Sequence, residues 1–204
     1  MKKIILILFI FCFSINAKSQ YIGGIADGFS SAKITNIPTN DTISISINLN
    51  SGWNLISSNV IPTVPNMANV FQNISSLVLV KNSSGAIYNP IFGINQIGNW
   101  NIAEGYQVYV SSPAILEIVG NAVIPEFTQI YLNAGWNLIS YLRNNDMLIS
   151  LALQSIEDEL IFAKDGLGNI YHPTFGINNI GDMQQGKGYW LYMSLPVIFI
   201  YPEN

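Results

Sequence analysis

The sequence predicts a mainly β fold made of two homologous β-rich repeats, each built from β-hairpins plus one short helix and packed together with pseudo-symmetry. Three observations predict it. A segment of the chain returns 83 residues later, with 24 of 66 compared positions identical and no gap. Within each copy, apolar and polar residues alternate with the period of a half-buried strand. Asn, Asp and Gly stand between these runs, where tight turns need residues that tolerate positive φ.

The repetition is clearest around one motif. The segment LNSGWNLIS at 49–57 returns as LNAGWNLIS at 132–140, and the same offset relates three later groups: IY at 87–88 and 170–171, FGIN at 92–95 and 175–178, GY at 105–106 and 188–189. Matching at one constant offset indicates a tandem duplication. We therefore assign residues 43–120 to a first β repeat and 121–204 to a second, which meet at a seam at 120–125.

Each copy begins with an expected hairpin. Residues 43–49 alternate in hydropathy and turn at 50–52 into a strand at 53–58, and the second copy shows the same pattern at 127–132 and 136–142. The remaining expected strands form a second hairpin at 77–81 and 86–88 (160–164 and 169–171 in the second copy), then a strand from Gly105 (Gly188) and a return strand at 115–119 (197–201).

One short helix is expected in each copy between the two hairpins. In the second copy, residues 144–146 (Asn-Asn-Asp) can cap a helix that runs through Met147, Leu151 and Leu153. The first copy has weaker helical spacing, at residues 65–73.

The first nineteen residues have the pattern of a secretory signal peptide. Met1-Lys2-Lys3 is cationic, residues 4–13 are apolar, and small residues precede an expected cleavage before Gln20. An apolar run of about ten residues is too short to span a bilayer. Residues 20–42 are expected to form an extended leader, and the mature chain to contain no transmembrane segment.

Composition excludes several classes of protein. Half of the 204 residues are hydrophobic and 10% are charged, the opposite of a disordered chain. The net charge of −4 provides no basic patch, so we expect no nucleic-acid partner. Removal of residues 1–19 takes three of the eight basic residues and the only cysteine, Cys12, and none of the twelve acidic residues, so the mature charge is −7. The mature chain therefore has no disulfide or thiol chemistry.

The repeat resembles a known kind of exported module. Each copy contains the same motifs in the same order: GWNLIS, then K-x-x-x-G-x-I-Y-x-P, then IG followed by G-Y-x-x-Y. This pattern is similar to the GWNLIS-type repeats of exported proteins in Gram-negative bacteria with gliding-associated (type nine) secretion. The start of the leader at 21–29 also looks like the start of such mature proteins. The resemblance covers residues 43–202 and brings no catalytic residue. Because cargo of this route usually ends in a separate sorting domain, which does not follow the second repeat here, we expect residence in the periplasm or at the cell surface.

Catalytic chemistry is not expected. His172 is the only histidine, its counterpart in the first copy is Asn89, and Ser140 is matched by Ser57, which indicates a shared structural role. The ligands that a zinc or calcium site needs are too few. The candidates for an acidic pair are Asp165, Asp182 and Glu104, whose counterparts Asn82, Asn99 and Lys187 are not acidic. We therefore predict no enzyme, no catalytic residue, no cofactor and no bound metal.

The tryptophans divide into two kinds. Trp53 and Trp136 are equivalent, and we expect each to fill the core of its own repeat. Trp100 aligns with Met183 and Trp190 with Gln107, so both are candidate contacts to a partner or a glycan; for Trp100, core packing is an equal alternative. Thr42, in the sequence Asp-Thr-Ile at 41–43, is a candidate O-glycosylation site, with an ordinary polar turn as the alternative.

These observations favour a non-catalytic exported protein of the cell envelope. The expected role is a β-repeat docking module, or an accessory subunit of an outer-membrane, secretion or surface assembly, because the apolar surplus indicates surface that meets a partner. The alternative is a carbohydrate-binding surface module.

Overall fold

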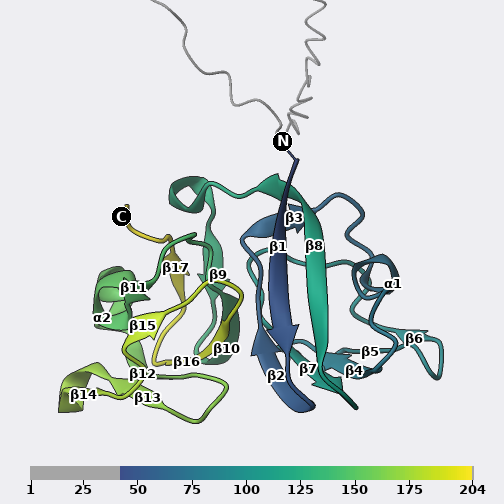
Figure 1. The fold of residues 1–204 in the computed structure, drawn as a ribbon. Coiled ribbons are helices and arrows are strands. Elements are labelled where there is room, and N and C mark those ends of the chain that lie inside the picture. The colour runs from purple at the N-terminus through teal and green to yellow at the C-terminus, as the bar shows by residue number, and fades with distance from the viewer. Residues whose placement is uncertain (1–41, 204) are drawn as a thin grey trace, which may run out of the picture. The chain divides into compact units, whose positions relative to one another are not determined.

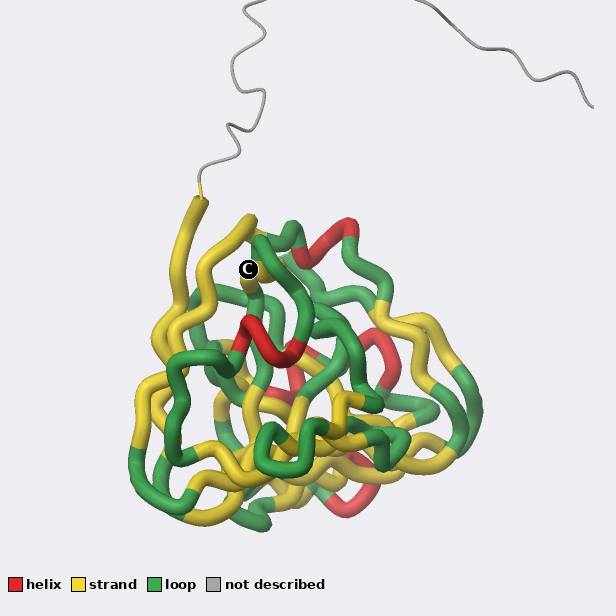
Figure 2. Tube along the Cα trace, turned by 90° about the vertical axis from the view of Figure 1, so that its right-hand side faces the viewer, coloured by secondary structure: helices red, strands yellow, loops and turns green. Residues whose placement is uncertain are grey.

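The computed structural model describes residues 42–203, which lie within one compact unit. The predicted signal peptide, and the leader apart from Thr42, lie outside the described residues. Figure 1 shows a mainly β architecture, which confirms the predicted fold class. Figure 2 shows that the short helices connect strands and do not form a layer of their own.

Each repeat contains a five-stranded antiparallel sheet with the same strand order. In the first repeat the order is β2 (Gly52–Ile56), β7 (Tyr106–Val110), β4 (Leu77–Lys81), β5 (Ile87–Asn89), β6 (Ile94–Asn95). In the second it is β10 (Gly135–Ser140), β16 (Gly188–Met193), β12 (Leu160–Lys164), β13 (Ile170–His172), β14 (Ile177–Asn178). The registers also agree at the 83-residue offset: Trp53 lies opposite Tyr109, and Trp136 lies opposite Tyr192. The predicted hairpins β4–β5 and β12–β13 are confirmed.

The first predicted hairpin of each copy is wrong. The strand β1 (Thr42–Leu49) pairs with β8 (Ala114–Ala122), which also pairs with β3 (Val60–Pro62), while β2 pairs with β7. Likewise β9 (Ile130–Leu132) pairs with β17 (Val197–Phe199), and β10 pairs with β16. The chain therefore leaves one sheet and enters another at the expected turn.

An asparagine side chain stabilises this corner in both repeats. The Asn54 amide accepts a hydrogen bond from the backbone N–H of Asn50 and donates to its carbonyl, and Asn137 makes the same bonds to Asn133. Gly52 and Gly135 provide the positive φ of +97° and +86° that the corner requires. The backbone groups that a hairpin partner would satisfy are thus satisfied locally.

The helices form where the sequence predicts them, but with different ends. They are α1 (Met67–Val70), capped by Asn66, and α2 (Ile149–Ala152), with short 3₁₀ turns η1 (Pro125–Phe127), η2 (Gln154–Ile156) and η3 (Pro173–Phe175) elsewhere. The predicted cap at 144–146 is wrong, because β11 (Met147–Leu148) follows it and pairs with β15 (Asp182–Met183).

The two helices are related by 82 residues, not 83. The N–H of Met67 donates to Gly98 and that of Ile149 donates to Gly181, so Met67 and Ile149 are equivalent. Two further buried pairs follow the same offset, Phe71 with Leu153 and Ile74 with Ile156. The gapless alignment is therefore wrong around the helix: the second copy lacks one residue between the GWNLIS strand and the helix, and it has one more residue between the helix and the second hairpin.

The repeats have separate hydrophobic cores, and the contacts between them come in pairs at the 83-residue offset. The N–H of Ser57 donates to Gly186, and the N–H of Ser140 donates to Ala103. Single β-bridges join Ile56 to Lys187 and Ile139 to Glu104, so that β2, β7, β10 and β16 are linked in a ring. These paired contacts lie at the ends of the GWNLIS strands and not at the predicted seam.

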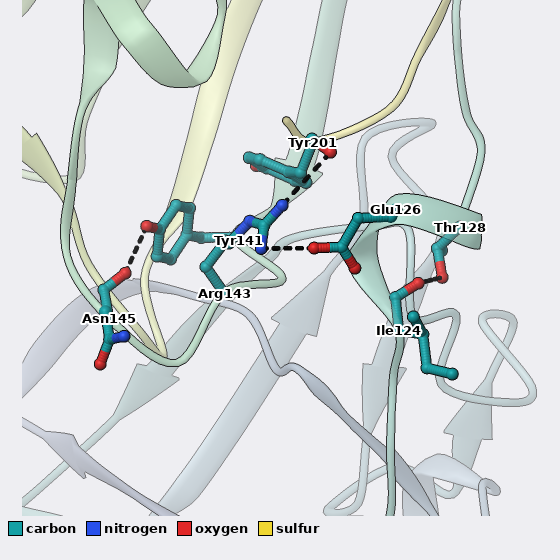
Figure 3. A network of polar contacts seen from close by, with 7 residues as sticks. All are labelled: Ile124, Glu126, Thr128, Tyr141, Arg143, Asn145 and Tyr201. Carbon is teal, nitrogen blue, oxygen red and sulfur yellow. Dashed lines mark hydrogen bonds and ion pairs between the residues drawn. The ribbon is translucent and has the colours of Figure 1, made fainter. Parts of the chain in front are cut away.

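A buried arginine attaches the C-terminal segment to the second repeat. Arg143 Nη1 lies 2.6 Å from Glu126 Oε1, and Nη2 donates to the carbonyl of Tyr201, as Figure 3 shows. The Tyr201 hydroxyl in turn donates to the carbonyl of Ser140 at 2.7 Å. The contacts therefore connect η1 and the chain end to β10.

Substitution of Gly105 or Gly188 by alanine should destabilise the protein. A Cβ at Gly105 would lie 2.8 Å from the carbonyl oxygen of Ile139, and one at Gly188 would lie 2.8 Å from that of Ile56. Because these obstacles are backbone atoms, each variant should lose about 2 kcal/mol of unfolding free energy in urea. Ser112→Thr, which adds a methyl group at an exposed position, is the control. Equal stability of all three variants would contradict the close approach.

Candidate functional site

Several polar residues that are identical in the two repeats bind backbone groups. The hydroxyls of Ser57 and Ser140 donate to carbonyls of the other repeat. The Tyr106 hydroxyl accepts from the N–H of Asn101 at 2.7 Å, and that of Tyr189 accepts from Gln184 at 2.8 Å. Burial raises the pKa of both tyrosines well above the ordinary value. The prediction that Ser57 and Ser140 have a shared structural role is confirmed.

The prediction that Trp53 and Trp136 fill the cores is wrong. Trp53 is 54% exposed and Trp136 is 48% exposed. The side chains of Asn54 and Asn137 bind the backbone of the corner on the inner side of the strand. Because successive side chains of a strand face opposite sides, the tryptophan that precedes each asparagine faces outward. Trp53 packs edge-on against Tyr109, with 5.2 Å between ring centroids.

Trp100 lies in the core, so its interpretation as a surface contact is wrong and the packing alternative is right. It is 6% exposed and packs against Tyr106, with 4.4 Å between ring centroids, and against Phe71. Its counterpart Met183 is also buried. The two repeats therefore fill the same core position with different side chains, and the lack of an aromatic counterpart does not indicate a surface residue.

Trp190 lies on the outward side of the second sheet, half-buried within a group of aromatic rings. It contacts Trp136 edge-on at 5.8 Å, and Trp136 also contacts Phe162 and Tyr192. Lys164 Nζ lies 5.8 Å from the centre of the Trp136 ring, within the range of a cation–π contact. We call these four aromatic residues (Trp136, Phe162, Trp190 and Tyr192) the aromatic face.

A groove of about 260 Å³ separates the aromatic face from Trp53. Its lining comes from both repeats: Trp53, Asn54, Leu55, Gln107, Lys164, Asp165, Gly166 and Trp190. A neighbouring pocket of about 340 Å³ shares five of these residues and extends toward Asn169 and Lys187. Within residues 42–203, the side chains of Gln107 and Lys164 form no hydrogen bond, whereas Asn54 and Asp165 are held by their own backbone contacts.

The acidic candidates do not form one cluster. Asp165 and Asp182 line the neighbouring pocket and Glu104 lines a different one. The Asp165 carboxylate accepts from Leu167 and Asn169 and so stabilises its own turn. His172 ends β13, and its ring packs against Phe175 at 4.4 Å. Thr42 is exposed at the start of β1, where a modification could reach it.

Comparisons of the chain with family models, with curated proteins and with solved structures find no match. Among residues 42–203, no three His, Cys, Asp or Glu side chains lie close enough together to hold a metal ion. In the same range, no helix is long and apolar enough to cross a bilayer. The groove and the exposed aromatic residues are therefore the candidate functional features.

Two glutamates should change stability with pH in opposite directions. Burial raises the pKa of Glu104, although hydrogen bonds from Asn82 and Asn101 oppose it. The charged form therefore disfavours folding, and the wild type gains stability as the pH falls through the folded pKa. Glu104→Gln should be more stable than wild type at pH 7, and the difference should shrink by pH 4, in thermal unfolding.

Glu126→Gln is the comparison of opposite sign. Hydrogen bonding by its own backbone N–H and by Arg143 lowers the pKa of Glu126. The charged Glu126 carboxylate therefore stabilises the folded state at neutral pH, and this stabilisation is lost as the pH falls. Glu126→Gln should be less stable than wild type at pH 7, and the difference should shrink in acid. A Glu104→Gln variant that is less stable than wild type at pH 7 would show that burial does not disfavour the charge.

Proposed function

We propose that this chain is a non-catalytic exported protein of the cell envelope whose repeats dock onto a partner assembly in the outer membrane or at the surface. One observation carries the proposal. Phe92 and Phe175 are identical at the 83-residue offset, yet they are 76% and 73% exposed. Core packing therefore does not account for their presence in both repeats, whereas aromatic residues, phenylalanine included, are enriched in protein interfaces.

Each phenylalanine sits in a tight turn that presents it to solvent. Gly93 N–H donates to the carbonyl of Pro90, and Gly176 N–H donates to that of Pro173, so the two turns have the same hydrogen bond. Because this bond fixes the backbone of each turn, little backbone freedom is lost when a partner covers the ring. Such turns are suited to docking.

The two docking points lie far apart. Phe92 lies in the turn that precedes β6, and Phe175 ends η3, which precedes β14; Figure 1 shows these two strands on opposite sides of the described structure. Two equivalent points on one scaffold can bind two copies of a partner, and simultaneous binding raises the overall affinity. An assembly of repeated subunits is therefore the partner that this arrangement favours.

Export remains part of the proposal. It is supported by the signal-peptide pattern at 1–19, by a mature chain without cysteine, and by the resemblance to GWNLIS-type repeat proteins. The accessible Thr42 agrees with modification in the envelope. Periplasm and cell surface are both consistent with these observations.

Substitution of both phenylalanines should abolish docking. In the native host, the tagged protein should crosslink to a specific envelope protein. Phe92→Ser or Phe175→Ser alone should reduce capture about tenfold, and the double variant should lose it, because two-point binding is lost. Capture is measured by quantitative mass spectrometry after mild crosslinking.

Leu195→Ser is the matched control. Leu195 is also exposed, but its counterpart is Ser112, so the residue is not shared by the repeats. Capture that is unchanged in the double phenylalanine variant, or equally reduced by Leu195→Ser, would refute docking through these turns.

A further inference from the structure

We propose that the groove between Trp53 and Trp190 binds an uncharged oligosaccharide. This activity goes beyond docking through Phe92 and Phe175, because neither phenylalanine lines the groove. The two tryptophans come from different repeats and line the same groove because the contacts between the repeats bring β2 and β16 together.

The rings are positioned before any ligand arrives. A sugar ring has an apolar C–H face that stacks on an aromatic ring and a hydroxyl edge that needs hydrogen bonds. Trp53 is supported edge-on by Tyr109 at an interplanar angle of 68°, and Trp190 by Trp136 at 86°. Because these contacts restrict the side chains of the free protein, binding loses less conformational entropy.

Polar groups for the hydroxyl edge line the same groove. The Gln107 amide supplies a donor and an acceptor, and Lys164 supplies a donor; within the described residues neither makes a hydrogen bond to the protein. Asn54 and Asp165 are held by backbone contacts and define the shape of the wall. The groove therefore combines stacking surfaces with available hydrogen-bonding groups, the composition that an amphipathic ligand requires.

The charges disfavour other ligands. The groove contains one cation, Lys164, and one anion, Asp165, in a chain of net charge −4, so a phosphate polymer would find no cationic surface. Leu55 is the only aliphatic side chain among the eight lining residues, so the apolar surface of the groove is mainly that of the two tryptophan rings. A neutral saccharide fits the remaining chemistry.

The second repeat shows how the space beside the equivalent tryptophan is filled. At the equivalent place, Trp136 packs against Trp190. In the first repeat, Gln107 stands where Trp190 stands in the second, and the smaller side chain leaves space beside Trp53. We therefore expect one saccharide site per chain, and Gln107→Trp should fill it.

The test uses the purified mature protein and a panel of soluble neutral oligosaccharides: cellohexaose, xylohexaose, mannohexaose, maltohexaose and hexa-N-acetylchitohexaose. We expect at least one to quench tryptophan fluorescence and to bind with a stoichiometry of one by calorimetry. Trp53→Ala and Gln107→Trp should each weaken binding at least about tenfold. Tyr131→Ala, which removes an exposed aromatic side chain outside the groove, should bind like wild type. Near-ultraviolet circular dichroism confirms that each variant is folded.

Three results would overturn the proposal. The first is no binding by any member of the panel. The second is binding that survives both groove substitutions. The third is loss of the crosslinked envelope partner in Trp53→Ala, which would make the groove part of a protein interface. The docking proposal is tested separately, because Phe92→Ser and Phe175→Ser leave the groove intact.

Discussion

The rest of the structure depends on the close approach of two pairs of strands. Ser57 and Ser140 each bind the backbone of the other repeat, and the absence of a Cβ at Gly105 and Gly188 allows the strands to come close enough for these bonds. The contacts link β2, β7, β10 and β16 in a ring. Because each repeat has its own hydrophobic core, this ring determines how the two sheets are spaced. The groove between their outward faces is a consequence of that spacing.

The fold was predictable where the signal was local. The alternating strands, the hairpins β4–β5 and β12–β13 and the short helices each depend on residues a few positions apart. The partners of β1 and β9 were not predictable, because the same alternation fits a hairpin or a corner between sheets. The choice is made by Asn54 and Asn137, whose amides satisfy the backbone groups that a hairpin partner would otherwise bind. The cap expected at 144–146 failed for a similar reason, since Met147 pairs with Met183, far along the chain.

The site was predictable in part. Identity between the repeats correctly indicates a structural role for Ser57, Gly105 and their counterparts. It is misleading for Trp53, because identity does not say which side of a strand a residue faces. The neighbouring Asn54 does indicate the side. Its side chain binds the backbone of the corner on the inner side of the strand, so the preceding residue faces outward. Trp100 shows the converse: a core position can accept Trp in one repeat and Met in the other when the surrounding residues adapt.

Duplication followed by divergence accounts for the two kinds of exposed aromatic residue. Phe92 and Phe175 stayed identical in turns with the same hydrogen bond, so a contact made by one repeat is available twice. Gln107 and Trp190 diverged where the outward faces of the two sheets meet, so the space beside Trp53 is open, whereas Trp190 packs against Trp136 in the second repeat. A chain with 10% charged residues has few charges to keep exposed rings apart from other molecules. The rings that remain exposed under that constraint are the observations behind both proposals: the two turns that present Phe92 and Phe175 support docking, and the edge contacts of Trp53 and Trp190 support a separate ligand in the groove.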